Sequence, residues 1–145
     1  TGIFLSKGKF ITFLDSDDEY SSTHLKERKV ILMHHPGIEF LHGGLTVIGS
    51  QYVPDRFDIN KMILVSDCYI GGTFFIKREI AVSFNGFKEM PLGSDGDFFE
   101  RIDKAGINIM KTQIPTYIYH RETADSITNN LMLGAEKFSW IPIEK

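Results

Sequence analysis

Apolar runs alternate along the chain with polar turns and with segments of helical spacing. Residues 10–14 are apolar and rich in β-forming side chains, and they pass directly into the acidic stretch 15–18. This pattern predicts a buried strand that ends in an acidic turn. Residues 23–33 mix apolar and charged positions as an amphipathic helix does, and the Pro-Gly pair that follows ends it. The apolar positions of this helix are Leu25, Val30, Leu32 and Met33.

The clearest helical pattern covers residues 94–105. Ser94 and Asp97 have the spacing of a capping box at its start, and Gly106 provides a C-terminal stop. Large apolar side chains recur between these ends, so one side of the helix is expected to face the core. These side chains are Phe98, Phe99 and Ile102.

Shorter elements are expected between and after these segments. The predicted strands are 38–41, 45–48, 73–76, 108–111 and 116–120. The remaining predicted helices are 58–65, a short one that opens at 77–79 and ends before Asn85, and 131–140. Strands and helices are mixed along the whole chain, which indicates an α/β fold with a partly mixed sheet.

The composition fits one globular domain, residues 1–145, and excludes several classes of function. The chain is 42% hydrophobic and carries a net charge of −3, so it is not disordered and has no broad positive field for nucleic acid. No apolar run approaches the ~20 residues of a membrane-spanning helix. The one cysteine, Cys68, cannot form an internal disulfide and is expected to be a small apolar group rather than a nucleophile.

The acidic turn carries the candidate chemistry. Asp15, Asp17 and Asp18 follow a strand directly, and open α/β sheets bind ligands at the carboxyl ends of their strands. Carboxylates crowded into one turn repel each other, and a divalent cation such as Mg²⁺ or Mn²⁺ relieves that repulsion. Such a cation could neutralise a substrate phosphate. The alternative is a solvated acidic loop in which Asp18 or Ser21 caps the next helix.

Two other acidic loops can be compared with this turn. A calcium loop of the EF-hand type fails, because its sixth and twelfth positions would be Tyr20 and Lys26. A phosphohydrolase of the haloacid dehalogenase type also begins with a strand and Asp-x-Asp, but Glu19 stands where that class has Thr or Ser. Residues 93–97 imitate its later Gly-Asp loop, so this alternative stays open, as does a carbohydrate-binding domain without catalysis.

An ordered set of segments resembles the family 2 glycosyltransferases, which have the GT-A fold. The segment 8–18 is similar to the run into that family's Asp-x-Asp motif, and Phe84-Asn85-Gly86-Phe87 is similar to its Gly-Phe turn. The remaining segments, in chain order, are 2–8, 71–78, 93–102, 115–121 and 125–128. The resemblance implies a partial GT-A catalytic domain of a sugar transferase.

Two departures from the family pattern qualify this expectation. Ser94-Asp95 stands where the family has Glu-Asp. The family's N-terminal nucleotide-binding half has no counterpart in this sequence, so the chain is expected to be a truncated catalytic domain that is inactive or nearly inactive alone. Loss of that half would expose the edge of strand 10–14, and we expect homo-oligomers to form through it.

The resemblance implies roles on the donor side of a site. Asp15 and Asp17 would bind the nucleotide-sugar, and Asp17 would hold Mg²⁺ or Mn²⁺. His120 would complete the metal site, and Arg121 would pair with the diphosphate. The alternatives are a histidine at a strand end and a surface arginine.

The resemblance also implies an acceptor side. Asp95 would be the general base that takes the proton of the acceptor hydroxyl, and Gly71, Gly72 and Thr73 would contact the acceptor. The alternatives are an acidic residue in a first helical turn and an ordinary glycine turn. The expected donor is a UDP-sugar, and the expected acceptor is a glycan or a lipid-linked sugar of a cell-envelope polysaccharide. The expected location is the cytoplasm, at the inner face of the membrane.

Overall fold

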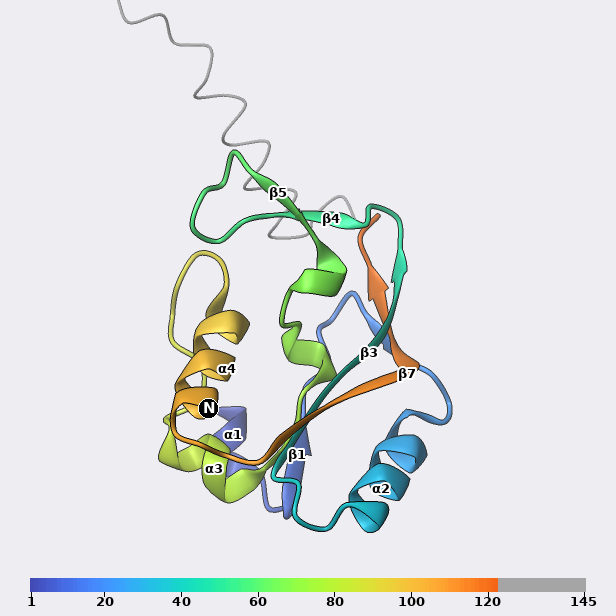
Figure 1. Ribbon diagram of the computed structural model, residues 1–145, viewed down its shortest axis with the longest axis vertical. Helices are drawn as coiled ribbons and strands as arrows, with labels where there is room; N and C mark the ends of the chain where they lie inside the picture. The colour runs from blue at the N-terminus through green and yellow to red at the C-terminus, as the bar shows by residue number, and fades with distance from the viewer. Residues whose placement is uncertain (123–145) are drawn as a thin grey trace, which may run out of the picture.

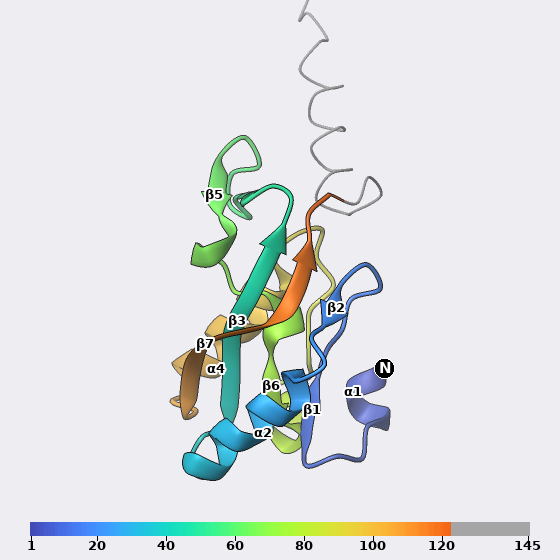
Figure 2. The same ribbon diagram turned by 90° about the vertical axis from the view of Figure 1, so that its right-hand side faces the viewer.

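The main feature of the fold is a mixed sheet of five strands (Figure 1). In order across the sheet, the strands are β1 (Phe10–Thr12), β6 (Phe75–Lys77), β3 (Phe40–Ile48), β7 (Ile109–His120) and β2 (Glu19–Tyr20). β3 and β7 are parallel, and the other neighbouring pairs are antiparallel. Figure 2 shows β3 and β7 side by side as the two long strands. The computed structural model describes residues 1–122, and the predicted helix 131–140 lies outside them.

Helices flank this sheet on both sides, and a small hairpin lies beyond one end of it (Figure 1). The helices are α1 (Gly2–Leu5), α2 (His24–His34), α3 (Arg78–Ser83) and α4 (Ser94–Lys104), with short 3₁₀ turns η1 (Val65–Asp67) and η2 (Gly71–Thr73). The hairpin pairs β4 (Tyr52–Pro54) with β5 (Met62–Leu64). The predicted α/β class with a mixed sheet is confirmed. The sequence analysis missed α1, β2 and β4.

The hydrophobic core lies between the sheet and α4. Phe40 and Phe74 meet edge to face with ring centroids 4.9 Å apart, and Phe98 and Ile102 of α4 are fully buried against the same cluster. Burial of each such side chain contributes about 1.5–3 kcal/mol. The predicted apolar side of α4 is therefore its core-facing side.

Two pairs of predicted strands are each one continuous strand. Segments 38–41 and 45–48 form β3, and segments 108–111 and 116–120 form β7. Gly43 and Gly44 lie inside β3 with φ values of +82° and +73°, and the register with β7 shifts there. A bulge thus replaces the predicted break, because glycine adopts this left-handed backbone without leaving the ladder.

Two predicted local features are wrong. The segment 58–65, predicted as a helix, is instead the end of the hairpin loop, β5 and the start of η1, because Met62–Leu64 pairs with β4. The capping box of α4 does not form, since Gly93 is the N-cap residue with φ +78° and no side chain caps the helix. Asp97 instead pairs with Lys88 and Arg101.

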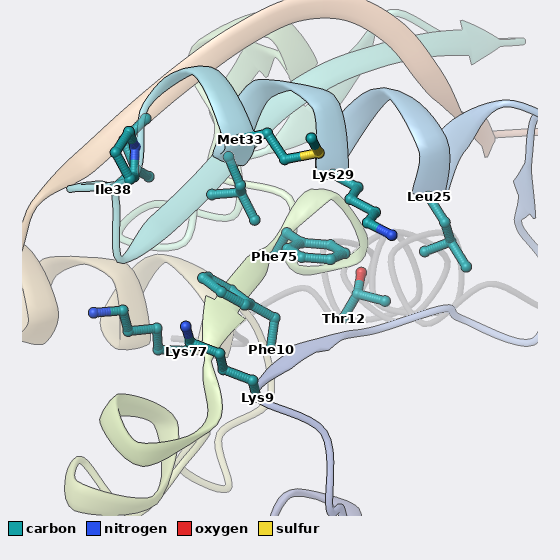
Figure 3. A pocket seen from close by; sticks show the side chains of 11 residues that line it. Lys9, Phe10, Thr12, Leu25, Lys29, Met33, Ile38, Phe75 and Lys77 are labelled. Atoms are coloured by element: carbon teal, nitrogen blue, oxygen red, sulfur yellow. The ribbon is translucent and has the colours of Figure 1, made fainter.

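The apolar positions of α2 do not enter the core. Leu25 and Met33 expose 56% and 70% of their surface, whereas His24 and Arg28 are buried. Leu25, Leu32 and Met33 instead line an open groove of about 640 Å³ between α2 and the edge of the sheet (Figure 3), and Val30 lies outside it. The groove's walls are Lys9, Phe10, Thr12, Leu25, Lys29, Leu32, Met33, Pro36, Ile38, Phe75 and Lys77.

β1 is an edge strand of the main sheet. Within residues 1–122 it pairs with β6 on one side and has no strand on the other. The predicted edge strand is confirmed for Phe10–Thr12, but the predicted burial of 10–14 is wrong, because only Ile11 is buried and Leu14, beyond the strand, is 51% exposed. Oligomerisation through that edge stays a prediction. None of the helices in the described part of the chain is both long and apolar enough to cross a membrane.

Candidate active site

The acidic turn after β1 is fastened to the end of β7 by Asp18. This side chain is 8% exposed. Its Oδ2 accepts a hydrogen bond from the Tyr117 hydroxyl at 2.6 Å, and its Oδ1 accepts one from the backbone N–H of His120 at 2.8 Å. Both carboxylate oxygens are thus engaged within the protein. Asp18 therefore shapes the loop, and Asp15 and Asp17 remain on its exposed side.

Tyr117 in turn depends on a glycine. A Cβ built on Gly72 would lie 2.0 Å from both Cζ and Oη of Tyr117, so no larger residue fits there. Burial raises the pKa of the Tyr117 hydroxyl, and the hydrogen bond to Asp18 raises it further. The hydroxyl therefore stays protonated and continues to donate to Asp18.

Asp15 has an environment that favours its protonated form. Its residue surface is largely exposed, but the protein around its carboxylate desolvates it in part. This burial raises the pKa of Asp15, and the charges of Asp18, Asp17 and Asp95 raise it further. Asp95 belongs to α4, so these charges come from two elements that are distant in the sequence.

Asp95 lies in the first turn of α4 and accepts two backbone hydrogen bonds. The N–H of Gly71 donates to its Oδ2 at 3.1 Å, and the N–H of Gly96 donates to its Oδ1 at 2.9 Å. Burial raises the pKa of Asp95, whereas these two bonds and the charge of Arg56 lower it, and the net direction is upward. A carboxylate with a raised pKa, held in place by backbone donors, is suited to accept a proton.

The three predicted acceptor residues form the η2 turn. Gly71 contacts Asp95 directly through its N–H. Gly72 is buried against Tyr117. Thr73 is 1% exposed, and its hydroxyl donates to the carbonyl of Ile70 at 2.7 Å and accepts from the N–H of Gly43 at 3.1 Å. Gly72 and Thr73 therefore position the turn, and contact of the turn with an acceptor stays a prediction.

His120 lies at the end of β7 between two glutamates. Its Nε2 is 3.2 Å from Glu19 Oε1, and its Nδ1 is 3.4 Å from Glu122 Oε1. Desolvation lowers the pKa of His120, but its bonds to Glu122 and Glu19 outweigh that effect and raise the pKa. The ring nitrogens therefore contact these glutamates, and no described contact joins His120 to Asp17.

Arg121 follows His120 and is 5% exposed. Its backbone N–H donates to the carbonyl of Ile48 at 2.7 Å, and its guanidinium lies 5.8 Å from the ring centroid of Tyr119. Burial raises the pKa of Tyr119, the charge of Arg121 lowers it, and the charges of Asp18 and Asp95 raise it. Arg121 thus lies on the β7 side of the same acidic region.

The donor set of the acidic turn can be tested against a divalent cation. Within residues 1–122, no three His, Cys, Asp or Glu side chains are arranged to hold a metal ion. Asp15 and Asp17 supply hard carboxylate oxygens, and Mg²⁺ in proteins commonly takes one or two carboxylates together with water and substrate phosphates. The two residues therefore fit a cation bound jointly with a phosphorylated ligand, rather than a cage built by the protein alone.

Two residues near Asp95 complete the description. Arg56, in the loop of the β4–β5 hairpin, was missed by the sequence analysis. The two glycines at the start of α4 could have suggested that a large side chain packs against this turn of the helix. Cys68 has its pKa raised to about 11 by burial and by Asp95, Asp67 and Asp55. The thiol is therefore not activated, as the sequence predicted.

The groove under α2 in Figure 3 is a separate feature. None of Asp15, Asp17, Asp18 and Asp95 lines it. We place the candidate site at the acidic turn because the carboxylates of Asp15 and Asp95, which come from two elements, have raised pKa values, whereas the groove is lined by lysines, apolar side chains and Thr12 and has no carboxylate.

The fold resembles a known sugar-transferring enzyme. The chain matches no protein-family model and no curated protein sequence. Among solved structures it is similar to the crystal structure of S. aureus TarS 1-349, a glycosyltransferase, with a TM-score of 0.55 at 18% identity. The similarity covers 98% of this chain and 44% of that one, so the chain spans less than half of its neighbour's length. The chain therefore has a glycosyltransferase-like fold.

Proposed function

We propose that this chain is part of a glycosyltransferase catalytic domain that moves a sugar from a nucleotide-sugar to a glycan or lipid-linked acceptor. One observation carries the proposal: the η2 turn connects the two carboxylate-bearing regions, because Gly71 donates to Asp95 of α4 and the adjoining Gly72 packs against Tyr117, which donates to Asp18 of the acidic turn. The glycosyltransferase-like fold supports the same conclusion. The assignment to family 2 rests on the sequence motifs, and the proposed donor is a UDP-sugar.

Asp95 is the proposed general base. The hydroxyl oxygen of the acceptor forms a bond to the anomeric carbon of the donor sugar while its proton moves to the Asp95 carboxylate. The bond between the anomeric carbon and the diphosphate oxygen breaks, and the diphosphate leaves with the electron pair. Attack opposite to the leaving group inverts the anomeric configuration. The backbone donors Gly71 and Gly96 fix the carboxylate for this transfer.

Asp15 and Asp17 are the proposed donor-side residues. They would hold Mg²⁺ or Mn²⁺ together with the diphosphate, and the cation would neutralise the charge that develops on the leaving group. Arg121 would pair with the same diphosphate, and His120 would be a further ligand of the cation. Asp18 supports this arrangement because it fixes the turn to β7.

The test measures ligand binding, because the chain alone is expected to turn over slowly. Mn²⁺ with UDP should raise the melting temperature of the full chain and broaden the NMR signals around the acidic turn. The variant D17N should lose both effects. D103N, which removes one carboxylate from the exposed end of α4, is the matched control and should keep them.

Activity assays separate the proposal from its alternatives. D95N should keep Mn²⁺–UDP binding and lose any UDP release that depends on an added acceptor. Equal binding by D17N and the parent chain would count against the donor site. Release of phosphate from a simple phosphoester, lost in D15N, would indicate the phosphohydrolase instead.

A further inference from the structure

The β4–β5 hairpin approaches the start of α4 through one side chain. The hairpin is a separate two-stranded sheet, and Figure 1 shows it near the end of α4 that carries Asp95. Arg56 lies in the loop between β4 and β5, and its side chain is 17% exposed. A long cationic side chain thus crosses from the hairpin to the first turn of the helix.

Two glycines make room for this side chain. A Cβ on Gly93 would lie 2.6 Å from Cδ of Arg56, and a Cβ on Gly96 would lie 2.6 Å from its Nη1. Glycine is a poor residue inside a helix, so Gly96 has a cost that its packing against Arg56 explains. The first turn of α4 is therefore shaped to receive the arginine.

Polar contacts hold Arg56 in this position. Its Nη2 pairs with Oε1 of Glu100, one helical turn beyond Gly96. Its Nη1 lies 3.5 Å from the carbonyl oxygen of Gly93, and its guanidinium carbon lies 4.4 Å from the ring centroid of Phe57. The guanidinium is thus held beside the backbone that presents Asp95.

We propose that Arg56 is a positioning residue for Asp95: it lies over Gly93 and Gly96, pairs with Glu100, and fixes the turn of α4 that presents the Asp95 carboxylate. The inference rests on the proposed function in so far as Asp95 acts as a base. It adds a role for the hairpin, which holds the base in place from outside the main sheet.

The positive charge of Arg56 favours the ionised form of Asp95, as expected of a cation held beside the first turn of α4. It lowers the pKa of Asp95 and opposes the upward effect of burial. The charge of Asp95 raises the pKa of three other groups, each from a different element. These groups are Asp15 after β1, Cys68 after η1 and Tyr119 on β7. Of these charged and titratable neighbours, Arg56 is the cation that favours the ionised base.

The experiment measures the titration of Asp95 directly, by side-chain carboxyl NMR on the full chain without donor. The amide signals of Gly71 and Gly96, which donate to Asp95, provide a second readout. R56Q should move the Asp95 midpoint upward and shift both amide signals. R56K, which keeps the charge, should move the midpoint less.

Two further variants separate positioning from hairpin stability. In G96A the new Cβ displaces the guanidinium while Arg56 is retained, and alanine is the better helix former, so α4 should persist. G96A should move the Asp95 midpoint upward, as R56Q does. K88Q removes a cation that pairs with Asp97 on the same helix and should leave the midpoint unchanged.

These measurements test the role of Arg56 independently of sugar transfer. An upward shift in both R56Q and G96A, with none in K88Q, supports it. An unchanged midpoint in G96A overturns it, even if R56Q loosens the hairpin. Failure of the parent chain to bind Mn²⁺–UDP would count against the proposed function and leave this result intact. If transfer is measurable, R56Q should lower kcat by ~10-fold or more at neutral pH and shift the pH profile upward.

Discussion

The acidic turn after β1 and the inner face of α2 both lie next to Tyr117. The buried polar atoms of the acidic turn are hydrogen-bonded, whereas several of those on α2 have no partner within residues 1–122. In the acidic turn, both oxygens of Asp18 accept hydrogen bonds. On α2, Arg28 donates to the carbonyl of Gly43, yet within residues 1–122 its Nε and Nη1, and Nε2 of His24, have no hydrogen-bond partner. The buried carboxylate of the acidic turn is therefore fully hydrogen-bonded. On α2, the buried guanidinium and imidazole groups lack some of their hydrogen bonds, which lowers the stability of the fold.

The two regions therefore respond differently to protons. The pKa values of Asp15, Asp18 and Asp95 are raised, chiefly by burial, so proton uptake there favours the folded state. The pKa of His24 is lowered to about 4 by burial and by Arg28, so proton uptake there favours unfolding. Repulsion between clustered carboxylates is a common feature of ligand sites, whereas the unpartnered polar atoms of α2 lower the stability of the fold.

The largest effect is expected where the two regions share a side chain. In G72A the new methyl group would overlap the Tyr117 ring, which is fully buried and cannot move away. We expect a loss of more than ~3 kcal/mol of unfolding free energy, measured by urea denaturation. G2A is the matched control, because a Cβ there meets nothing within 4 Å. An equally small effect in both variants would mean that Tyr117 is not fixed against η2.

We expect the fold to lose stability in acid because of two buried histidines, His24 on α2 and His42 in β3. The pKa of His42 is lowered to about 4 by burial, Lys111 and Arg28, as that of His24 is by burial and Arg28. Both pKa values fall below that of an unfolded histidine, so stability is full above about pH 6.5 and falls toward pH 4.

At pH 5 each of these histidines should lower the unfolding free energy by about 2 kcal/mol relative to pH 7.5. H24Q and H42Q should each remove its share of this loss in urea titrations at the two pH values. H34Q, at the exposed end of α2, is the control and should retain the parent slope. The raised pKa values of Asp15 and Asp18 act in the opposite direction. Acid stabilisation throughout this range would show that the turn dominates.

A smaller effect is expected from the link between Asp18 and Tyr117. Y117F leaves Oδ2 of buried Asp18 without its donor, which should cost about 1–2 kcal/mol. The Tyr117 hydrogen bond lowers the pKa of Asp18, so its loss should raise that pKa, as carboxyl NMR would detect. Y52F, at a half-exposed tyrosine of the hairpin, should change neither quantity.

The sequence predicted well those elements that local patterns determine. The apolar run into the acidic turn and the buried side of α4 were both evident, because one periodicity decided each. The sequence named the candidate site residues, but that Asp17 and Asp95 face one shared site, as the enzyme hypothesis requires, stays a prediction. The ligand and metal roles of these residues remain predictions.

Tertiary context decided what the sequence did not predict. Leu25, Leu32 and Met33 of α2 line a groove, while Arg28 is buried and donates to the carbonyl of Gly43 in β3. Arg56 packs against two glycines of α4 because the hairpin docks there, and no pattern of spacing in the sequence predicts that contact. The break predicted within β3 failed because Gly43 and Gly44 form a bulge.

The smallest expected effect sharpens the claim that the acidic turn stores repulsion. D15N removes a carboxylate whose pKa is raised by burial and by the charges of Asp18, Asp17 and Asp95. We expect it to stabilise the fold by about 0.5 kcal/mol at pH 7 and low salt, because the group is exposed enough for water to screen it. In 1 M NaCl the gain should shrink. D103N, on the exposed end of α4, should show no such gain. A stabilisation in D15N that persists at high salt would mean that relief of desolvation, the largest cause of the raised pKa, accounts for the gain, and that repulsion among the four carboxylates adds little to it.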